Sequence, residues 1–320
     1  MNRRFVRLAL AAVGLWGALI GTAAAKYPDK PLRMIVPYAA GGGVDNITRV
    51  VAKGLGTRLD QSIVVDNRPG ASANIGANMV AKASADGYTL LIGATFLAFN
   101  RATTTNLPYD AAKDLIPVAR LGKAPFVLVV PAVLPIRTVA ELVAYMKANP
   151  NKASYGAVGA GSPTNLIFPK NTNTTPIQIL YKGGAAAMPD LIAGRITFMI
   201  QTASEVLPLI RSGKLRALAV TGLTRFNQLP DVPTMKEAGV PDLESTGWWG
   251  VFAPAHTPAA IVKRLSDEVQ LVMKQPDVIA ALYKMGIESA PMPTSEFRPF
   301  FDQELKSYVD VARQFNLTVN

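Results

Sequence analysis

The clearest chemical signal in the sequence is a run of three glycines at positions 41–43, followed closely by an aspartate. Residues 34–36 before it are typical of a short buried strand, and residues 44–51 after it carry apolar side chains at helical spacing. A strand, a glycine loop and a helix in this order present backbone N–H groups and a helix N-terminus to an anion. We therefore predict an anion site on this loop, with the candidates Tyr38, Ala40, Gly41, Gly42, Gly43 and Asp45.

The residues after the glycines disfavour a nucleotide. A phosphate-binding P-loop needs lysine and then serine or threonine there, whereas this chain has Val44 and Asp45, and the third glycine of a dinucleotide fingerprint is not in place. Two interpretations remain, a tight turn without a ligand and a site for an anion of carboxylate size. Asp45 either bonds a ligand-bound water or caps its own helix.

A second loop, Gly-Ala-Gly-Ser-Pro-Thr at 159–164, has similar chemistry. Ser162 is a good N-cap residue, and the proline after it suits the first position of a helix. Thr95 and Phe96 follow a strand expected at 87–93, at the edge of the sheet where open α/β folds bind ligands. Two helix N-termini facing one cleft would hold a carboxylate or dicarboxylate. Phe96 either packs against a ligand ring or belongs to the core.

The elements that would position these loops alternate between strands and helices, which predicts an α/β fold. Thr138 and Glu141 form a capping-box pattern at the start of one helix. We also expect a short helix at 234–238 and a helix at 258–274 capped by Thr257. A chain of this length favours two lobes over one core. The expected divisions are 1–25, 26–125, 126–248 and 249–320, with strands at 126–130 and 248–252 crossing between the lobes.

The first 25 residues are typical of a secretory signal peptide. Three arginines at positions 3, 4 and 7 precede an apolar run at 8–20, and three alanines at 23–25 provide a cleavage site. We predict cleavage after Ala25 and a mature protein outside the cytoplasm. No later stretch approaches the roughly 18 apolar residues of a membrane helix.

Composition argues against several classes of function. The formal net charge is +11, but the basic residues are scattered, which disfavours nucleic acid as a partner. The chain has no cysteine and one histidine, His256, so thiol chemistry and a His-rich metal site are excluded. A Ser-His-Asp triad would depend on His256, and no G-x-S-x-G motif is present. We expect no enzyme, no cofactor and no metal, and keep a secreted hydrolase as a remote alternative.

Short segments along the chain resemble, in order, the Bug-type receptors of tripartite tricarboxylate transporters. They are YPDKPLRMIVPY at 27–38, GGVD at 42–45, VDNRPGA at 65–71, NIG at 74–76, DGYTL at 86–90, YKG at 181–183, GKLRALA at 213–219, LPDVPT at 229–234, EAG at 237–239, WG at 249–250, AP at 253–254 and TP at 257–258. The resemblance implies a type II periplasmic binding protein, with two α/β domains joined by crossing hinge strands around a ligand cleft. It implies a periplasmic monomer that closes over a small organic carboxylate, a di- or tricarboxylate or an aromatic acid, and delivers it to integral membrane transporter subunits. A receptor that senses a carboxylate for a signalling partner is the alternative.

The resemblance also implies which residues contact the ligand. Besides the opening loop, Thr95 and Phe96, the candidates are Ala160, Gly161, Ser162, Asn165, Tyr181 and Gln201. Asn165 replaces a histidine that is frequent in the family. Gln201 stands where an acidic residue is frequent, so an ammonium group on the ligand would lack its counter-charge, and an acid without an amine is favoured. Tyr181 either reaches the cleft or packs against the next helix.

Overall fold

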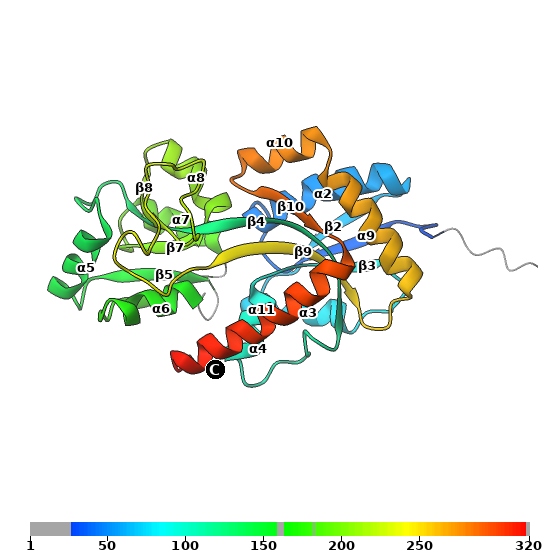
Figure 1. Cartoon of the computed structure of the whole chain (residues 1–320), viewed down its shortest axis with the longest axis horizontal. Coiled ribbons are helices and arrows are strands. Elements are labelled where there is room, and N and C mark those ends of the chain that lie inside the picture. Colours follow the sequence, from blue (N-terminus) through cyan, green and yellow to red (C-terminus); the bar gives the residue numbers. More distant parts are fainter. Residues whose placement is uncertain (1–26, 159–162, 182, 318–320) are drawn as a thin grey trace, which may run out of the picture.

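Two α/β halves lie side by side in the structure and are joined by two long strands (Figure 1). The computed structural model describes residues 27–158, 163–181 and 183–317. The long strands are β4 (Leu115–Pro131) and β9 (Thr246–Pro254), which pair antiparallel between the halves. The expected signal peptide and its cleavage site lie outside the described residues. The fold is the predicted α/β arrangement, with strands that cross between two halves.

The first half contains a sheet of order β10-β4-β9-β3-β1-β2. Strand β1 (Leu32–Val36) is parallel to β2 (Ile63–Asn67) and β3 (Thr89–Ala94), whereas β9 is antiparallel to β3. Strand β10 (Glu288–Met292) completes the far edge. The helices of this half are α2 (Gly43–Leu59), α3 (Asn74–Ala81), α4 (Phe96–Thr103), α9 (Ala259–Met273), α10 (Pro276–Lys284) and α11 (Thr294–Gln314).

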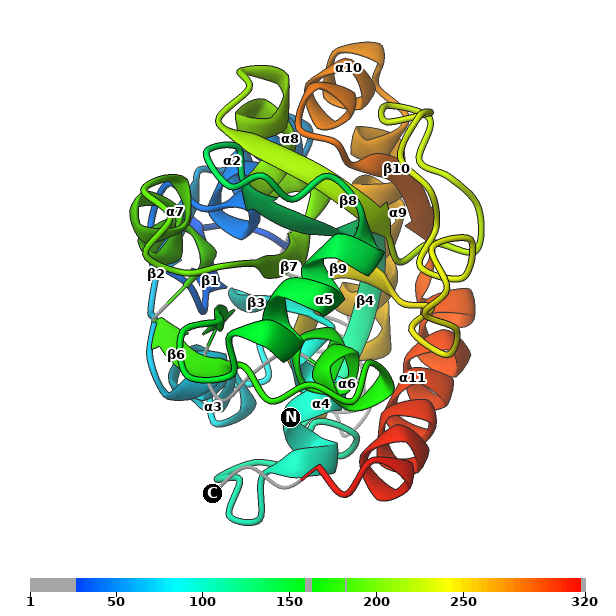
Figure 2. The ribbon, with the colours of Figure 1, turned by 90° about the vertical axis from the view of Figure 1, so that its left-hand side faces the viewer.

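The second half is built on the last part of β4. There β4 pairs with β7 (Met199–Thr202) and β8 (Leu215–Val220). Strands β5 (Ser154–Val158) and β6 (Ile177–Tyr181) are parallel, and a bridge from Tyr155 to Phe198 connects them to the segment before β7. The helices are α5 (Val139–Ala148), α6 (Pro163–Asn171), α7 (Gly184–Ile192) and α8 (Ala203–Arg211), and the view of Figure 2 faces this half.

Strand β4 is much longer than its sequence indicates. The continuous apolar run predicts only 126–130, because Pro117, Gly122 and Pro125 interrupt the pattern before it. The structure accommodates the interruptions with register shifts against β9, between Pro117 and Ala119 and again between Arg120 and Gly122. Strand β4 therefore runs through the expected domain division at 125–126, and β9 runs through the one at 248–249. The domain boundaries themselves stay a prediction.

Two expected helix features are wrong. Residues 234–238 form a hydrogen-bonded turn in place of a helix, in which Ala238 N–H donates to the Thr234 carbonyl at 2.9 Å. The turn does not extend into a helix, because Gly239 directly after it has a φ of 83°, outside the helical region. Thr257 does not cap α9 either, since its hydroxyl donates to the Pro254 carbonyl at 2.8 Å and Pro258 occupies the N-cap position.

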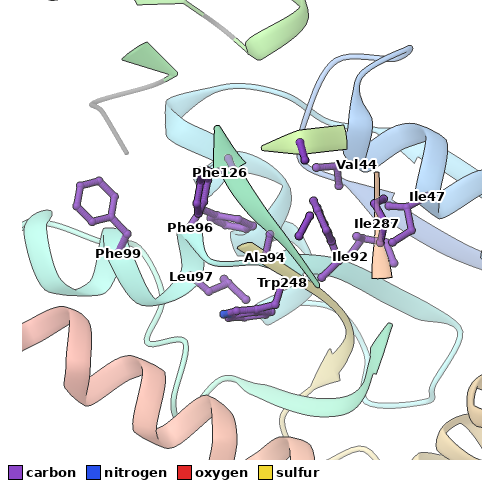
Figure 3. Packing of buried hydrophobic residues seen from close by; sticks show 14 of the residues in the cluster. Val44, Ile47, Ile92, Ala94, Phe96, Leu97, Phe99, Phe126, Trp248 and Ile287 are labelled. Carbon is purple, nitrogen blue, oxygen red and sulfur yellow. The ribbon is translucent and has the colours of Figure 1, made fainter. Parts of the chain in front are cut away.

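Aromatic packing fixes β9 to the C-terminal helix. Trp248 is 1% exposed and packs edge-to-face on Phe297 and Phe301, with ring centroids 5.7 and 5.9 Å apart. Its indole N–H donates to Glu304 at 2.8 Å. Each such ring pair contributes about 0.5–1.5 kcal/mol beyond its burial. One of the two strands that join the halves is thus held firmly on one side, and Figure 3 shows Trp248 among the buried side chains near the junction.

Candidate ligand-binding cleft

A cavity of about 160 Å³ lies between the two halves. On the first half it is bounded by the residues that follow β1 and β3, and on the second half by those that follow β6 and β7. Its lining residues are Tyr38, Ala39, Gly42, Gly43, Val44, Ser72, Ala94, Thr95, Phe96, Phe99, Asn100, Phe126, Gly183, Gly184, Ala185, Ala186, Gln201, Thr202, Glu205, Gly247, Trp248 and Trp249. Ligands of open α/β folds bind beyond the carboxyl ends of strands, as here.

Four helices in the described part of the chain, α2, α4, α7 and α8, begin at this cavity. Their N-cap residues are Gly42, Thr95, Gly183 and Thr202, and none of these makes a side-chain capping hydrogen bond. The first N–H groups of a helix have no partner within the helix, and the helix dipole adds partial positive charge at that end. The cavity therefore has backbone donors on both sides that suit a carboxylate.

The remaining wall is apolar and largely aromatic. Phe96 from α4 meets Tyr38 edge-to-face, with ring centroids 5.9 Å apart. Phe126 from β4 and Trp249 from β9 line the same space, and Figure 3 shows the side chains of Phe96, Phe126 and Trp248. Burial, together with the charge of Glu205, raises the pKa of the Tyr38 phenol, which therefore stays protonated. Such walls bury a carbon skeleton and leave its polar ends to the helix N-termini.

Six of the candidates from the sequence line the cavity, namely Tyr38, Gly42, Gly43, Thr95, Phe96 and Gln201. Thr95 and Phe96 follow β3 as expected, and they begin a helix, with Thr95 as the N-cap and Phe96 as the first residue of α4. Ala160, Gly161 and Ser162 lie outside the described residues, whereas the helix expected after them is present, because α6 begins at Pro163. On the second half the described lining comes from the start of α7 and from the β7–α8 corner. Ligand contact by each candidate stays a prediction.

Asp45 points into the protein from the first turn of α2 and organises the glycine loop. It is 2% exposed and accepts hydrogen bonds from Gly41 N–H at 2.9 Å, Arg49 Nε at 2.9 Å and Asn67 Nδ2 at 3.0 Å. Burial acts to raise the pKa of this carboxyl, but the bonds from Arg49, Gly41 and Asn67 outweigh it and hold the pKa below its usual range. Its contacts shape the loop, and neither Asp45, Gly41 nor Ala40 lines the cavity.

Asn165 and Tyr181 also lie away from the cavity lining. The Asn165 amide is 1% exposed and both accepts from Ile200 N–H and donates to the Ile200 carbonyl at 3.0 Å, which ties α6 to β7. The Tyr181 hydroxyl donates to Asp190 at 2.8 Å, and Arg195 holds the other oxygen of that carboxyl at 2.7 Å. Both side chains position the elements that carry the site.

A left-handed turn at the cavity was not anticipated from the sequence. Ala71, Ser72 and Ala73 have φ values of 46°, 55° and 75°, a region that L-residues rarely occupy in succession. Asn100 on α4 secures the turn, because its amide donates to the Ser72 carbonyl at 2.8 Å and to Asn74 Oδ1 at 2.9 Å. No residue of this turn has a propensity that predicts such a conformation.

A larger cavity of about 470 Å³ lies between α11 and the second half, lined among others by Arg120, Leu243 and Tyr308. It is not bounded by the segments that follow β1, β3, β6 and β7, and none of the candidates from the sequence lines it. No group of three acidic, histidine or cysteine side chains suited to a metal occurs in the described part of the chain. None of the described helices combines the length and apolar character that a membrane crossing needs.

Two α/β halves, crossing strands and a cleft between them define a periplasmic-binding-protein fold. The family model described as tripartite tricarboxylate transporter family receptor (TctC) matches residues 47–317, and the chain belongs to this family. Protein BugT of Bordetella pertussis (strain Tohama I) is 34% identical over 314 residues, covering 95% of this chain and 96% of BugT.

Two solved structures are similar over nearly their whole length. A Rhodopseudomonas palustris protein with adipate is 33% identical, with a TM-score of 0.87 over 91% of this chain and 99% of that one. MatC from the same organism, with bound malate, is 28% identical, with a TM-score of 0.84 over 89% and 99%.

Proposed function

We propose that this protein is an extracytoplasmic receptor that binds a small organic carboxylate between its two halves. The observation that carries the proposal is the convergence of four helices, uncapped by side chains, on one largely aromatic cavity. The helix N-termini supply donors for carboxylate oxygens, and the rings cover the carbon skeleton. Adipate and malate in two related structures support an acid of this kind.

The size of the cavity bounds the ligand. An engineered apolar cavity of about 150 Å³ takes up benzene, and the cleft measures about 160 Å³. We therefore propose a ligand of about six to ten non-hydrogen atoms, which covers four- to six-carbon dicarboxylic acids and a single-ring aromatic acid. Citrate lies above this range.

We further propose that the protein is exported to the periplasm, with cleavage after Ala25, and passes its ligand as a monomer to integral membrane transporter subunits. The family supports the compartment and the transport role. Mass spectrometry of the mature protein from a periplasmic extract tests the cleavage site, and a mature N-terminus other than Lys26 would contradict it.

A thermal-shift screen of the mature protein against four- to six-carbon dicarboxylic acids, citrate and aromatic acids tests the binding function. A ligand at about 100 times its dissociation constant adds roughly 2.7 kcal/mol to the free energy of unfolding. Hits are measured by calorimetry, after unfolding and refolding have removed any acid that was carried through purification.

The control is Ala186→Trp. Ala186 is exposed at the start of α7 and lines the cavity, so an indole there fills the cleft without disturbing the core. The variant should melt like the native protein and lose the ligand response. Native protein that responds to no acid, or Ala186→Trp protein that responds equally, would contradict the proposal.

A further inference from the structure

Glu205 is the one charged side chain among the described residues that line the cavity. It lies in the first turn of α8, at the edge of the second half. Its Oε2 atom is excluded from solvent and has no hydrogen-bond partner in the described part of the chain. A buried carboxylate oxygen without a donor is costly, and its presence in a ligand cavity calls for an explanation.

The sequence around Glu205 offers it a local partner that the structure does not use. Thr202 and Glu205 match the capping-box pattern, in which the glutamate accepts from a backbone N–H at the helix start. The Thr202 N–H instead donates to the Gln201 side chain at 3.1 Å, and the Thr202 hydroxyl pairs with Ser204 Oγ at 2.9 Å. The carboxyl is thereby released from a role in its own helix.

The same pattern occurs at two other places, and there the acid is satisfied. Glu237 accepts from Thr234 N–H at 2.8 Å, while its own N–H donates to the Thr234 hydroxyl at 3.1 Å. Glu141 accepts from Arg137 N–H at 2.6 Å. These sites are an internal comparison, and among the three patterns only the one at the cavity leaves its carboxyl free.

Glycines on two facing helices make room for this carboxyl. A Cβ on Gly184 of α7 would lie 1.6 Å from Glu205 Oε2, and a Cβ on Gly43 of α2 would lie 3.2 Å from Glu205 Cγ. The acid therefore sits between the N-termini of α7 and α2, where a ligand would meet both halves. Backbone and side-chain donors nearby do not reach its Oε2 atom.

No cation balances Glu205 from the neighbouring elements that the structure describes. Tyr38 after β1 is the other titratable side chain at the cavity and stays neutral. On α2, Asp45 is engaged by Arg49, and on α7, Asp190 is engaged by Arg195. Burial raises the pKa of Glu205 to about 7, so the closed cleft favours a proton or a donor at this carboxyl.

We infer that Glu205 is the specificity-determining acceptor of the cleft, and that the ligand is a small carboxylic acid carrying an amino or hydroxyl donor on its carbon chain. The inference rests on the proposed function and narrows its ligand class. It also revises the interpretation drawn from Gln201, because an acidic side chain that lines the cavity is present four residues further along the chain. A ligand donor satisfies an acceptor that the protein leaves empty, whereas a plain dicarboxylate adds a second anion beside it.

Calorimetry with succinate, malate and aspartate tests the inference, because the three acids share one skeleton and differ only in the donor. Malate or aspartate should bind at least about tenfold more tightly than succinate. Glutarate against glutamate makes the same comparison on a longer skeleton. In Glu205→Met, which keeps the length and removes the acceptor, the preference should fall to within about threefold.

Two further variants complete the test. One distinguishes a hydroxyl donor on the ligand from an ammonium donor, and the other controls for the loss of a carboxylate elsewhere in the protein. Glu205→Gln keeps a carbonyl acceptor without charge, so it should retain a preference for malate and lose one for aspartate. Glu141→Gln, the same change in the same pattern at an exposed position of α5, should leave all affinities unchanged. Melting temperatures of the variants establish that each is folded.

The pH dependence of the affinity is an independent test, because a donor from the ligand and a proton from solvent at Glu205 predict changes of opposite sign. A ligand donor keeps bound Glu205 ionised, so the affinity for the favoured acid should hold or rise between about pH 6 and 8. If Glu205 instead takes up a proton when the acid binds, the affinity should fall as the pH rises through about 7. Succinate or glutarate that binds as tightly as its donor-bearing analogue, and more tightly at low pH, would overturn the inference and leave the receptor function intact. Failure of every acid in the panel would overturn both.

Discussion

At the scale of single residues, Asp45 is the buried charge that holds the glycine loop in shape. Its carboxyl accepts from a main-chain N–H of the loop and from two side chains, all within 3.0 Å. The sequence left two roles open for it, and the contacts favour an organising role within the protein. These three hydrogen-bond partners are all donors, so the site requires a group with two acceptor oxygens.

Asp45→Asn should therefore lower the free energy of unfolding at neutral pH by about 1–3 kcal/mol, because an amide turns its NH₂ group toward donors and leaves them unpaired. The folded-state pKa of Asp45 lies below its ordinary value, so its contribution is present above about pH 4 and is lost as the pH falls through the folded pKa. Urea denaturation at several pH values checks this, and the two proteins should converge in acid.

Arg49→Gln is the matched comparison for Asp45→Asn. The Arg49 side chain is 53% exposed, and exposed ion pairs contribute about 0–1 kcal/mol. It should cost much less than Asp45→Asn at neutral pH. Equal costs for the two variants, or a cost for Asp45→Asn that persists in acid, would show that the carboxylate is not what supports the loop.

Residue patterns in the sequence pointed to part of the cleft and missed the rest for identifiable reasons. Glycine runs and N-cap residues act through local geometry, so they can be recognised in the amino-acid sequence. Glu205 looks like an ordinary capping-box residue, and only the tertiary contacts of Thr202 show that the box is not formed. Phe126 and Trp249 read as core residues and are buried, yet they also line the cavity.

At the scale of elements, the left-handed turn before α3 is the feature that local propensity contradicts. Three consecutive non-glycine residues with positive φ cost roughly 1–2 kcal/mol each relative to the right-handed region. The turn persists because Asn100 and the start of α3 fix its position. It lines the cavity through Ser72, so the strain is concentrated where the ligand would bind.

Ala71→Gly should raise the free energy of unfolding by about 0.5–1 kcal/mol, because glycine accepts a positive φ and the exposed Ala71 side chain loses no packing. Ala71→Val should lower it, since a β-branched residue resists this conformation. Ala144→Gly, at an exposed position inside α5, should lower it by about 0.5–1 kcal/mol. Chemical denaturation checks the opposite signs, and two alanine-to-glycine changes of the same sign would contradict the account.

Most regular elements were predictable from the sequence because each has a local signal. The strand expected at 34–36 lies within β1, the helical spacing at 44–51 lies within α2, and Thr138 caps α5 as expected. Strand β10 was not anticipated because Pro291 interrupts its pattern. Helix α4 was not anticipated because its first turn is uniformly apolar and shows no helical spacing. The first part of β4 was missed because its regularity comes from pairing with β9 and β10, which no local pattern encodes.

At the scale of the whole molecule, tight glycine packing brings the two halves into contact beside the cleft. Gly43 at the start of α2 faces α8 so closely that an added Cβ would lie 2.8 Å from Ser204 Oγ. The halves are therefore closed together here, and a Cβ at this position would require either the Ser204 side chain or the halves to shift. Closure stabilises a bound ligand only through contacts made in the closed form.

Gly43→Ala should keep the two halves from closing fully, because the added methyl group would meet Ser204 of the second half. Alanine suits the first turn of a helix, so the melting temperature of the ligand-free protein should change little. The affinity for the bound acid should fall at least about tenfold, because the closed form is the one that the ligand selects. Small-angle scattering of the liganded variant should give a larger radius of gyration than that of the liganded native protein.

Gly42→Ala provides the control one residue away. A Cβ there would meet only the Ala39 carbonyl oxygen, at 3.6 Å, which is an ordinary contact on the same half. Its scattering in the presence of ligand should match that of the native protein, whatever its effect inside the cavity. A Gly43→Ala protein that closes as fully as Gly42→Ala would mean that the contact between α2 and α8 yields easily. The closed form would then depend on the crossing strands and on the ligand, and the sheet junction of β4 and β9 would be the place to change the closure equilibrium.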